Sequence, residues 1–295
     1  MRLFPALIIL VLLAFVNSIQ DPTQTPSQSK SSAPTEVEQE LNETAKNYKE
    51  GKFAEAQQHA ERAVLLDPAN RTAAIFLARV MHQRYKPGDN SPESLNYAQG
   101  AIAAYQRVLT LDPLNEEPYK AVAVLYASTH QDELLKAWLM QRALDPRFSN
   151  AQRAEAYTTL AGKDWDCSFK FTELPEQKIR TVEKGRAVVT YKMPQDRTAF
   201  ARAKECVNHG FEMVDFALSL NRESDAAWSY NANLLLEAAK LAEMEGRAAA
   251  KANFVTKAKE ASFEAGRLSD KRRRAEESGE PEPKPSPSPS LSLRY

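Results

Sequence analysis

The sequence has 295 residues, of which 43% are hydrophobic, 8% are aromatic and only 9 are glycine. Lys plus Arg and Asp plus Glu each number 39, so the formal net charge is zero, and attraction to nucleic acid through bulk charge is excluded. Few glycines argue against turn-rich β folds and phosphate-binding loops. Abundant alanine with few aromatic residues is typical of helices packed through small side chains.

The N-terminal segment has the pattern of an export signal. A charged start precedes the apolar run of residues 3–16, which is shorter than the roughly 20 residues of a spanning helix. We expect a signal peptide over residues 1–18, and hence a periplasmic or secreted chain. The alternative is that residues 3–16 stay in place as a membrane tether, which would be the chain's membrane contact. Residues 19–35, rich in Pro, Ser, Thr and Gln, are expected to be a linker without fixed structure.

A helical pattern then recurs. After Gly51, residues 53–66 carry alanines at positions 56, 60 and 63, which share one stripe of a helix where another helix can approach closely. Asp67-Pro68 ends that helix. The pattern returns as Ala101, Tyr105 and Val108 before Asp112-Pro113, and more loosely as Gly210, Val214 and Ala217.

The expected helices follow in chain order. Residues 36–50 and 53–66 form a first pair, and residues 73–81 open a second one, which residues 86–92 interrupt as an expected surface loop. Later helices are expected from Pro118, over 132–144, from Tyr157, over 198–220, from 224 to 244 and from 247 to 268.

Two segments lack helical periodicity. Within an insert of residues 171–196, the β-prone runs 178–182 and 186–191 surround a glycine turn and predict a small β-hairpin. Residues 271–295 are charged and rich in Pro and Ser, and are expected to be a tail without fixed structure.

The helical pattern resembles the tetratricopeptide repeat, a helix pair of about 34 residues. Tyr157, Leu160 and Ala161 show its aromatic, Leu and small positions, as does the run from Pro118-Tyr119. The resemblance covers roughly residues 36–270. It implies an all-α, α-α superhelical solenoid of about five helix pairs with a small β-hairpin insertion. The order of features from Trp165 onward also looks like a group of exported bacterial tetratricopeptide proteins without an assigned activity.

Cys167 and Cys206 are the only cysteines. In an exported chain two cysteines favour one disulfide, which would close a loop of about 40 residues and stabilise by about 4 kcal/mol in the chain-entropy model. The alternative is two small buried residues that never meet. No histidine or further cysteine stands at zinc spacing to either one, so neither a metal site nor a cofactor is predicted.

Catalytic motifs are also missing from the sequence. His59, His82, His130 and His209 stand apart from any Ser, Asp or Cys arrangement that activates a nucleophile. Phosphate loops, HExxH and Gly-x-Ser-x-Gly are absent. We predict that the chain is not an enzyme.

In stacked helix pairs the first, or A, helix of each pair lines the concave side, where partners bind. The resemblance places the following residues there as candidate partner contacts: Arg79, His82, Gln83, Lys120, Thr158, Trp165 and Asn233. Further inner positions are Glu117, Val124, Gly162 and Glu237. Two alternatives stay open. Arg79 and Lys120 are equally compatible with a solvated helix face that contacts no partner. Trp165 is compatible either with the groove or with packing on the hairpin insert.

The sequence therefore favours a non-catalytic protein–protein interaction scaffold in the cell envelope, which binds a peptide or partner protein in its groove. One alternative is a transient assembly or maturation factor for exported proteins. Another is an enzyme or small-molecule binder with a site near residues 171–196.

Overall fold

The computed structural model describes residues 34–278, so the expected signal peptide and nearly all of the expected linker lie outside the described residues. Contacts divide the chain into Met1–Thr35 and Glu36–Tyr295, and every described helix and strand belongs to the second unit. Within the described range, no helix combines the length and the apolar character that crossing a membrane requires.

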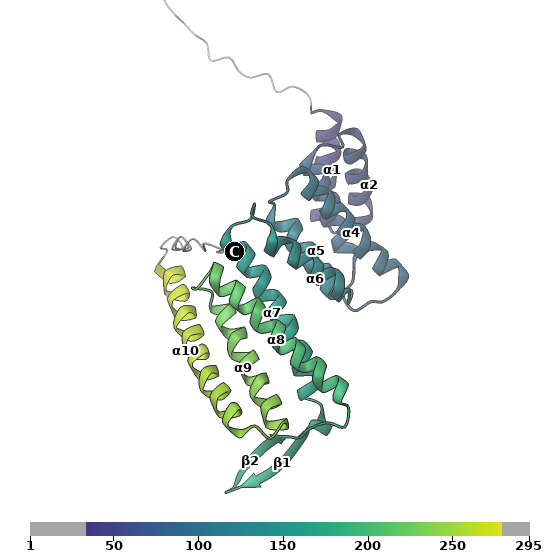
Figure 1. Ribbon diagram of the computed structural model, residues 1–295. Helices are drawn as coiled ribbons and strands as arrows, with labels where there is room; N and C mark the ends of the chain where they lie inside the picture. The colour runs from purple at the N-terminus through teal and green to yellow at the C-terminus, as the bar shows by residue number, and fades with distance from the viewer. Residues whose placement is uncertain (1–33, 279–295) are drawn as a thin grey trace, which may run out of the picture. The chain divides into compact units, whose positions relative to one another are not determined.

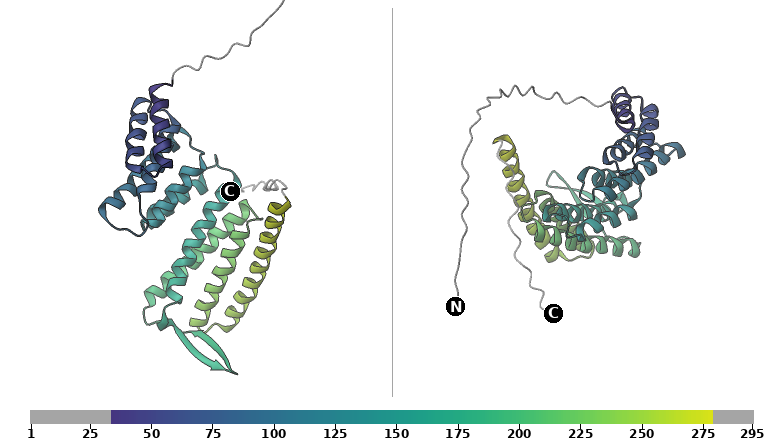
Figure 2. Two further views of the ribbon diagram at one scale, coloured as in Figure 1. Left: turned by 180° about the vertical axis from the view of Figure 1, so that it is seen from behind. Right: turned by 90° about the horizontal axis from the view of Figure 1, so that it is seen from above.

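The described residues form ten α-helices and one β-hairpin (Figures 1 and 2). The first six helices are α1 (Glu36–Lys49), α2 (Phe53–Leu66), α3 (Arg71–Arg84), α4 (Pro92–Leu111), α5 (Glu116–Ser128) and α6 (Asp132–Leu144). The other four are α7 (Asn150–Thr172), α8 (Arg197–Leu220), α9 (Asp225–Met244) and α10 (Ala248–Ser278). Between α7 and α8 lie a short 3-10 turn (Pro175–Gln177) and the strands β1 (Lys178–Glu183) and β2 (Arg186–Tyr191).

Consecutive helices pack as pairs: α1 with α2, α3 with α4, α5 with α6, α7 with α8, and α9 with α10. Each pair also contacts the next one, as α2 contacts α3 and α6 contacts α7. The described residues thus form an all-α solenoid of helix pairs with a small hairpin insertion. This confirms the fold class that the resemblance to the tetratricopeptide repeat implies.

Small side chains set the spacing between helices. Ala56, Ala60 and Ala63 of α2 are fully buried, which confirms the predicted alanine stripe. Gly210 of α8 serves the same purpose more strictly, since a Cβ there would lie 2.7 Å from Cδ2 of Leu234 on α9. Close packing between neighbouring helices therefore depends on these small residues.

Several helices begin at side-chain caps. Ser224 accepts a hydrogen bond from the amide of Ala227, as expected for an N-cap residue. Ser149 and Gln152 form a reciprocal capping box at the start of α7. Ser91 caps α4, whose first residue is Pro92. The start predicted at Ser224 is therefore confirmed, whereas α7 begins at Asn150, well before the predicted Tyr157, because Ser149 caps it.

The second helix pair accommodates its extra residues in two places. The sequence predicts that they form a surface loop, and a loop does separate α3 from α4. However, α4 has 20 residues, whereas α2 of the first pair has 14. The insertion therefore also lengthens the second helix of the pair.

Helix α10 continues to Ser278, so residues 271–278, predicted to belong to the unstructured tail, are helical. Charged side chains explain the extension. Arg273 pairs with Asp270 one turn before it, and Arg272 and Lys271 pair with Asp225 and Glu223 near the start of α9. These contacts support a helix whose sequence is otherwise that of a charged tail.

The β-hairpin is confirmed. Lys178 faces Tyr191 at the open end, and Glu183 faces Arg186 beside the turn. The turn residues Lys184 and Gly185 both have positive φ, at 49° and 76°. This left-handed pair is the conformation of the two-residue hairpin turn and favours glycine at its second position. Strand β2 also contacts α9.

Candidate functional site

The A helices α3, α5 and α7 carry a group of exposed or partly exposed side chains, which we call the A-helix surface. It consists of Arg79, Gln83, Glu117, Lys120, Val124 and Glu155. The three residues of α5, at positions 117, 120 and 124, follow one another at helical spacing on one side of that helix. Ion pairs connect this stripe to the helices on either side.

Arg79 of α3 and Glu117 of α5 form a two-point ion pair. Arg79 Nε lies 2.6 Å from Oε1 and its Nη2 lies 2.5 Å from Oε2. The guanidinium lowers the pKa of the Glu117 carboxyl through this hydrogen bonding, so the carboxylate is charged at neutral pH. Both side chains remain partly exposed, so water and salt weaken the pair.

Lys120 continues the stripe toward α7. Its Nζ lies 3.2 Å from Oε1 of Glu155 and 3.9 Å from Oε2 of Glu116. Val124, one turn further along α5, is 57% exposed. The A-helix surface is therefore of mixed charge with one apolar side chain beside it.

The other predicted contact residues are less accessible. The hydroxyl of Thr158 donates to the carbonyl of Ala154, and the residue is only 5% exposed. His82 is partly buried, with Nδ1 3.3 Å from the Tyr105 hydroxyl, and burial lowers the pKa of its imidazole. Asn233 is partly buried on α9.

Trp165 is partly buried against two aromatic rings. The centroid of its ring lies 4.9 Å from that of Phe169 on α7 and 6.2 Å from that of Tyr230 on α9. The structure thus places Trp165 at the contact between α7 and α9, with Phe169 and Tyr230 as its aromatic neighbours. Arg79, Gln83 and Lys120 alone of the predicted set belong to the A-helix surface.

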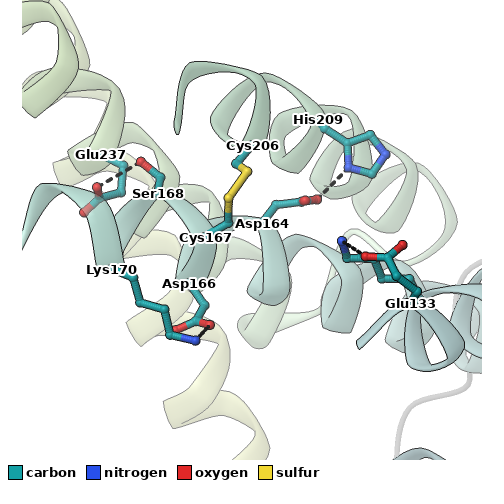
Figure 3. The surroundings of a disulfide bond; sticks show 10 residues. Glu133, Asp164, Asp166, Cys167, Ser168, Lys170, Cys206, His209 and Glu237 are labelled. Carbon is teal, nitrogen blue, oxygen red and sulfur yellow. Dashed lines mark hydrogen bonds and ion pairs between the residues drawn. A yellow bond between two sulfur atoms is a disulfide. The ribbon is translucent and has the colours of Figure 1, made fainter. Parts of the chain in front are cut away.

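A disulfide joins Cys167 of α7 to Cys206 of α8, as predicted (Figure 3). It lies beside an ion pair that sequence reasoning missed. Nδ1 of His209 is 2.7 Å from Oδ2 of Asp164, so His209 is not isolated. Burial raises the pKa of Asp164, and the hydrogen bond to His209 opposes that rise. The spacing carried a signal: Asp164 lies three residues before one cysteine and His209 three after the other, on antiparallel helices.

The Asp164–His209 pair lines a cavity of about 320 Å³ together with Glu133, Lys136 and Lys163. Lys163 is itself paired with Asp132 at 2.7 Å. The cavity lining contains no serine, threonine or cysteine that the histidine could activate. Over residues 34–278, no group of three or more His, Cys, Asp or Glu side chains is arranged to hold a metal ion.

A buried charged cluster lies between α7 and α9, beginning at Ser168, the residue after Cys167. Glu237, placed by the sequence pattern among the inner surface positions, is 1% exposed. It accepts a hydrogen bond from Ser168 at 3.2 Å (Figure 3). It also accepts one from Thr172 at 2.7 Å, and its other oxygen lies 2.6 Å from Nζ of Lys240. Glu237 is therefore part of the packing and does not contribute to the A-helix surface.

Lys240 extends this cluster to the hairpin. Its Nζ lies 3.0 Å from Oε1 of Glu173, which also pairs with Lys178 of β1 and accepts from the hydroxyl of Tyr191 on β2. The hydrogen bond from Lys178, and then that from Lys240, lower the pKa of Glu173 to about 2. Glu173 thus anchors both strands of the insert to the helices.

Comparison with known proteins does not identify a family for this chain. No family model matches the chain, and no curated protein matches it. Two solved structures described as crystal structures of MamA are similar at 13% sequence identity. One has a TM-score of 0.41 and the match covers 78% of this chain and 96% of that chain. The other has a TM-score of 0.40, with 85% and 98% covered. The fold assignment rests on the helix pairs themselves.

Proposed function

We propose that this chain is a non-catalytic protein-interaction scaffold that binds a peptide or partner protein through the A-helix surface. One observation carries the proposal: charged side chains of three successive A helices are at least partly exposed and form ion pairs with one another. Exposed pairs of this kind contribute about 0–1 kcal/mol to stability. A partner can therefore replace them at little cost to the fold.

The chemistry of the surface defines the partner. Arg79 and Lys120 would exchange Glu117 and Glu155 for acidic groups of a partner, while the released carboxylates would take its basic groups. Val124 offers an apolar contact next to these charges, and apolar side chains enclosed by polar ones are typical of binding surfaces. Packed helix pairs hold the three A helices in place, so the partner meets a preformed surface.

We further propose that the scaffold works in the cell envelope. The N-terminal pattern of a charged start and a short apolar run supports export. The disulfide between Cys167 and Cys206 supports it independently, because such bonds persist in oxidising compartments. A non-catalytic role agrees with the Asp164–His209 pair, which has no nucleophile beside it.

The test is cross-linking and recovery of partners from an envelope fraction with the full chain. We expect one dominant partner, cross-linked at Lys120. The variant Arg79→Glu with Lys120→Glu should recover at least about tenfold less of it, because reversed charges repel the same partner groups.

A matched control reverses the exposed Arg202 of α8 and Lys259 of α10, which changes the net charge equally on other helices. It should recover the partner normally. Equal recovery by both variants, with circular dichroism showing both folded, would exclude the A-helix surface as the binding site.

A further inference from the structure

A small cavity of about 130 Å³ lies where α5, α6 and the loop leading to α7 meet. Tyr119, Trp138, Arg142 and Phe148 form its walls, and Asp145 and Arg147 lie at its lining as well. We call it the Arg142 pocket. It has room for a group of a few heavy atoms, and is smaller than the 300–1,000 Å³ typical of drug-sized ligands.

Arg142 is an unusual residue for this place because its side chain is only 1% exposed. Its guanidinium carbon lies 4.0 Å from the ring centroid of Tyr119 and 4.8 Å from that of Phe148. Its Nη2 donates to Oε1 of Glu116 at 2.5 Å. Within the described part of the chain, Nε and Nη1 of this buried cation have no hydrogen-bond partner.

Tyr119 adds a third free donor. Its hydroxyl is buried and, among residues 34–278, has no hydrogen-bond partner. Burial raises the pKa of Tyr119, so the hydroxyl keeps its proton at neutral pH. The ring itself is fixed, since it stacks on Trp138 with centroids 5.5 Å apart, and the indole nitrogen of Trp138 donates to the Tyr119 carbonyl.

The charge of Arg142 is only partly compensated. The Glu116 side chain is 39% exposed, so water screens it, whereas Arg142 is almost fully enclosed. Glu116 is also shared, because Gln152 of α7 donates to the same oxygen. Asp145 at the lining is already bound to Arg147, at 2.6 Å. The pocket thus combines a buried cation, whose counterion is partly exposed and shared, with donors that lack an acceptor.

We propose that the Arg142 pocket binds a carboxylate group. A carboxylate is small enough for this volume, and its oxygens supply acceptors for the guanidinium and the Tyr119 hydroxyl. The group can come from an acidic side chain or C-terminus of a partner peptide, or from a free small carboxylate. This inference does not rest on the proposed scaffold function, and its test involves no partner recovery.

The first experiment uses acetate as the probe and acetamide, of nearly the same size and shape, as the neutral control. Saturation-transfer NMR on the methyl group of each compound, titrated against the full chain, measures binding. We expect acetate to bind at least about tenfold more tightly than acetamide, because a charge-assisted hydrogen bond is roughly twice as strong as a neutral one.

Tyr119→Phe removes the free hydroxyl but keeps the ring, and should weaken acetate binding several-fold without loss of folding. Tyr126→Phe is the matched control, since the Tyr126 hydroxyl accepts from Gln106 and does not line the pocket. It should bind acetate as the original chain does. Arg142→Met should abolish binding, with folding checked by circular dichroism.

A second arm separates the two sources of the carboxylate. The probe is a capped Gly-Asp-Gly peptide, compared with its Asn counterpart. Tighter binding of the Asp peptide than of acetate assigns the pocket to a partner segment, and the reverse order assigns it to a free small carboxylate. Equal binding of acetate and acetamide, no binding of any probe, or no effect of Tyr119→Phe would overturn the proposal.

Discussion

The two ends of the helix array are held together by different means. From α1 to α6 the helices have 13 to 20 residues and are held by buried apolar side chains, together with partly exposed ion pairs such as Arg79–Glu117. From α7 to α10 they have 20 to 31 residues and are joined by a disulfide, a buried charged cluster and an anchored hairpin.

This difference matters because each pair of a solenoid contacts only its neighbours, so stability adds up locally. We expect α7–α10 to open last and α1–α6 to open first. The A-helix surface lies mostly on the less constrained end, where side chains can rearrange around a partner, while the cross-linked end keeps the array in register.

Removal of the buried Glu237 carboxylate should have the largest effect. Glu237→Ala leaves Lys240 without its closest partner and leaves the Ser168 and Thr172 hydroxyls without their acceptor. Breaking a buried pair in this way lowers the free energy of unfolding by about 3–5 kcal/mol. Urea unfolding followed by circular dichroism measures it.

The control for that experiment is Glu223→Ala, since Glu223 pairs with Lys271 on the surface. Its free energy of unfolding should change by less than about 1 kcal/mol. Similar small values for both variants would mean that the charged cluster does not stabilise the α7–α10 end.

The disulfide should have the second largest effect. Replacing Cys167 and Cys206 together by alanine should lower the free energy of unfolding by about 2–4 kcal/mol, because the unfolded chain regains the entropy of the opened loop. Hydrogen exchange should then speed up in α7 and α8 and stay unchanged in α1–α4. A melting temperature that reductant leaves unaltered would contradict this expectation.

Gly210 tests the close packing of α8 on α9. Gly210→Ala places a Cβ 2.7 Å from Cδ2 of Leu234 and 3.1 Å from Cβ of Asp164, so it should destabilise by about 1–3 kcal/mol. Gly266→Ala in α10 meets no atom within 4 Å. It should be neutral or stabilising by up to about 1 kcal/mol, through helix propensity. Thermal unfolding of both variants distinguishes them, and equal melting temperatures would count against tight packing at Gly210.

The hairpin anchor should respond to acid. The pKa of Glu173 is lowered from the ordinary 4.5 to about 2, so its contribution to stability is fully present above about pH 4.5 and is lost as the pH falls through about 2. Hydrogen exchange of β1 and β2 should therefore accelerate between these values. Glu173→Gln should show fast exchange at every pH, and an unchanged pH profile in that variant would assign the effect to other groups.

The exposed pair Arg79–Glu117 should have the smallest effect. A double-mutant cycle with alanine at both positions should give a coupling energy below about 1 kcal/mol, despite the two short contacts, because both side chains are partly exposed. Raising the salt concentration to about 1 M should reduce the coupling further. A coupling above about 2 kcal/mol would make this pair a structural link and would weaken its proposed role as an exchangeable contact.

Local patterns made most of the fold predictable. The alanine stripe of residues 56, 60 and 63 and the Asp67-Pro68 stop define α2 completely, and the glycine turn with its β-prone flanks defines the hairpin. The end of α10 could not be read in this way, because it depends on ion pairs with Glu223 and Asp225, far away in the sequence.

The candidate sites were harder to predict for a physical reason. Charged residues in a helical pattern are almost always exposed. The resemblance therefore places Glu237 on the inner surface, and nothing in the sequence distinguishes Arg142 from exposed arginines. The fold shows that the rings of Tyr119 and Phe148 enclose Arg142. It also shows that the Ser168 and Thr172 hydroxyls donate hydrogen bonds to Glu237.

The hairpin turn lies inside the loop that the disulfide closes. Lys184 and Gly185 are exposed, and they lie within the stretch that Cys167 and Cys206 close into a covalent ring. A protease that cuts at this turn would leave one molecule on a non-reducing gel and two fragments after reduction. The same ring would keep the chain connected if a reporter tag with its own cleavage site were inserted there, which makes the turn a practical place for a label.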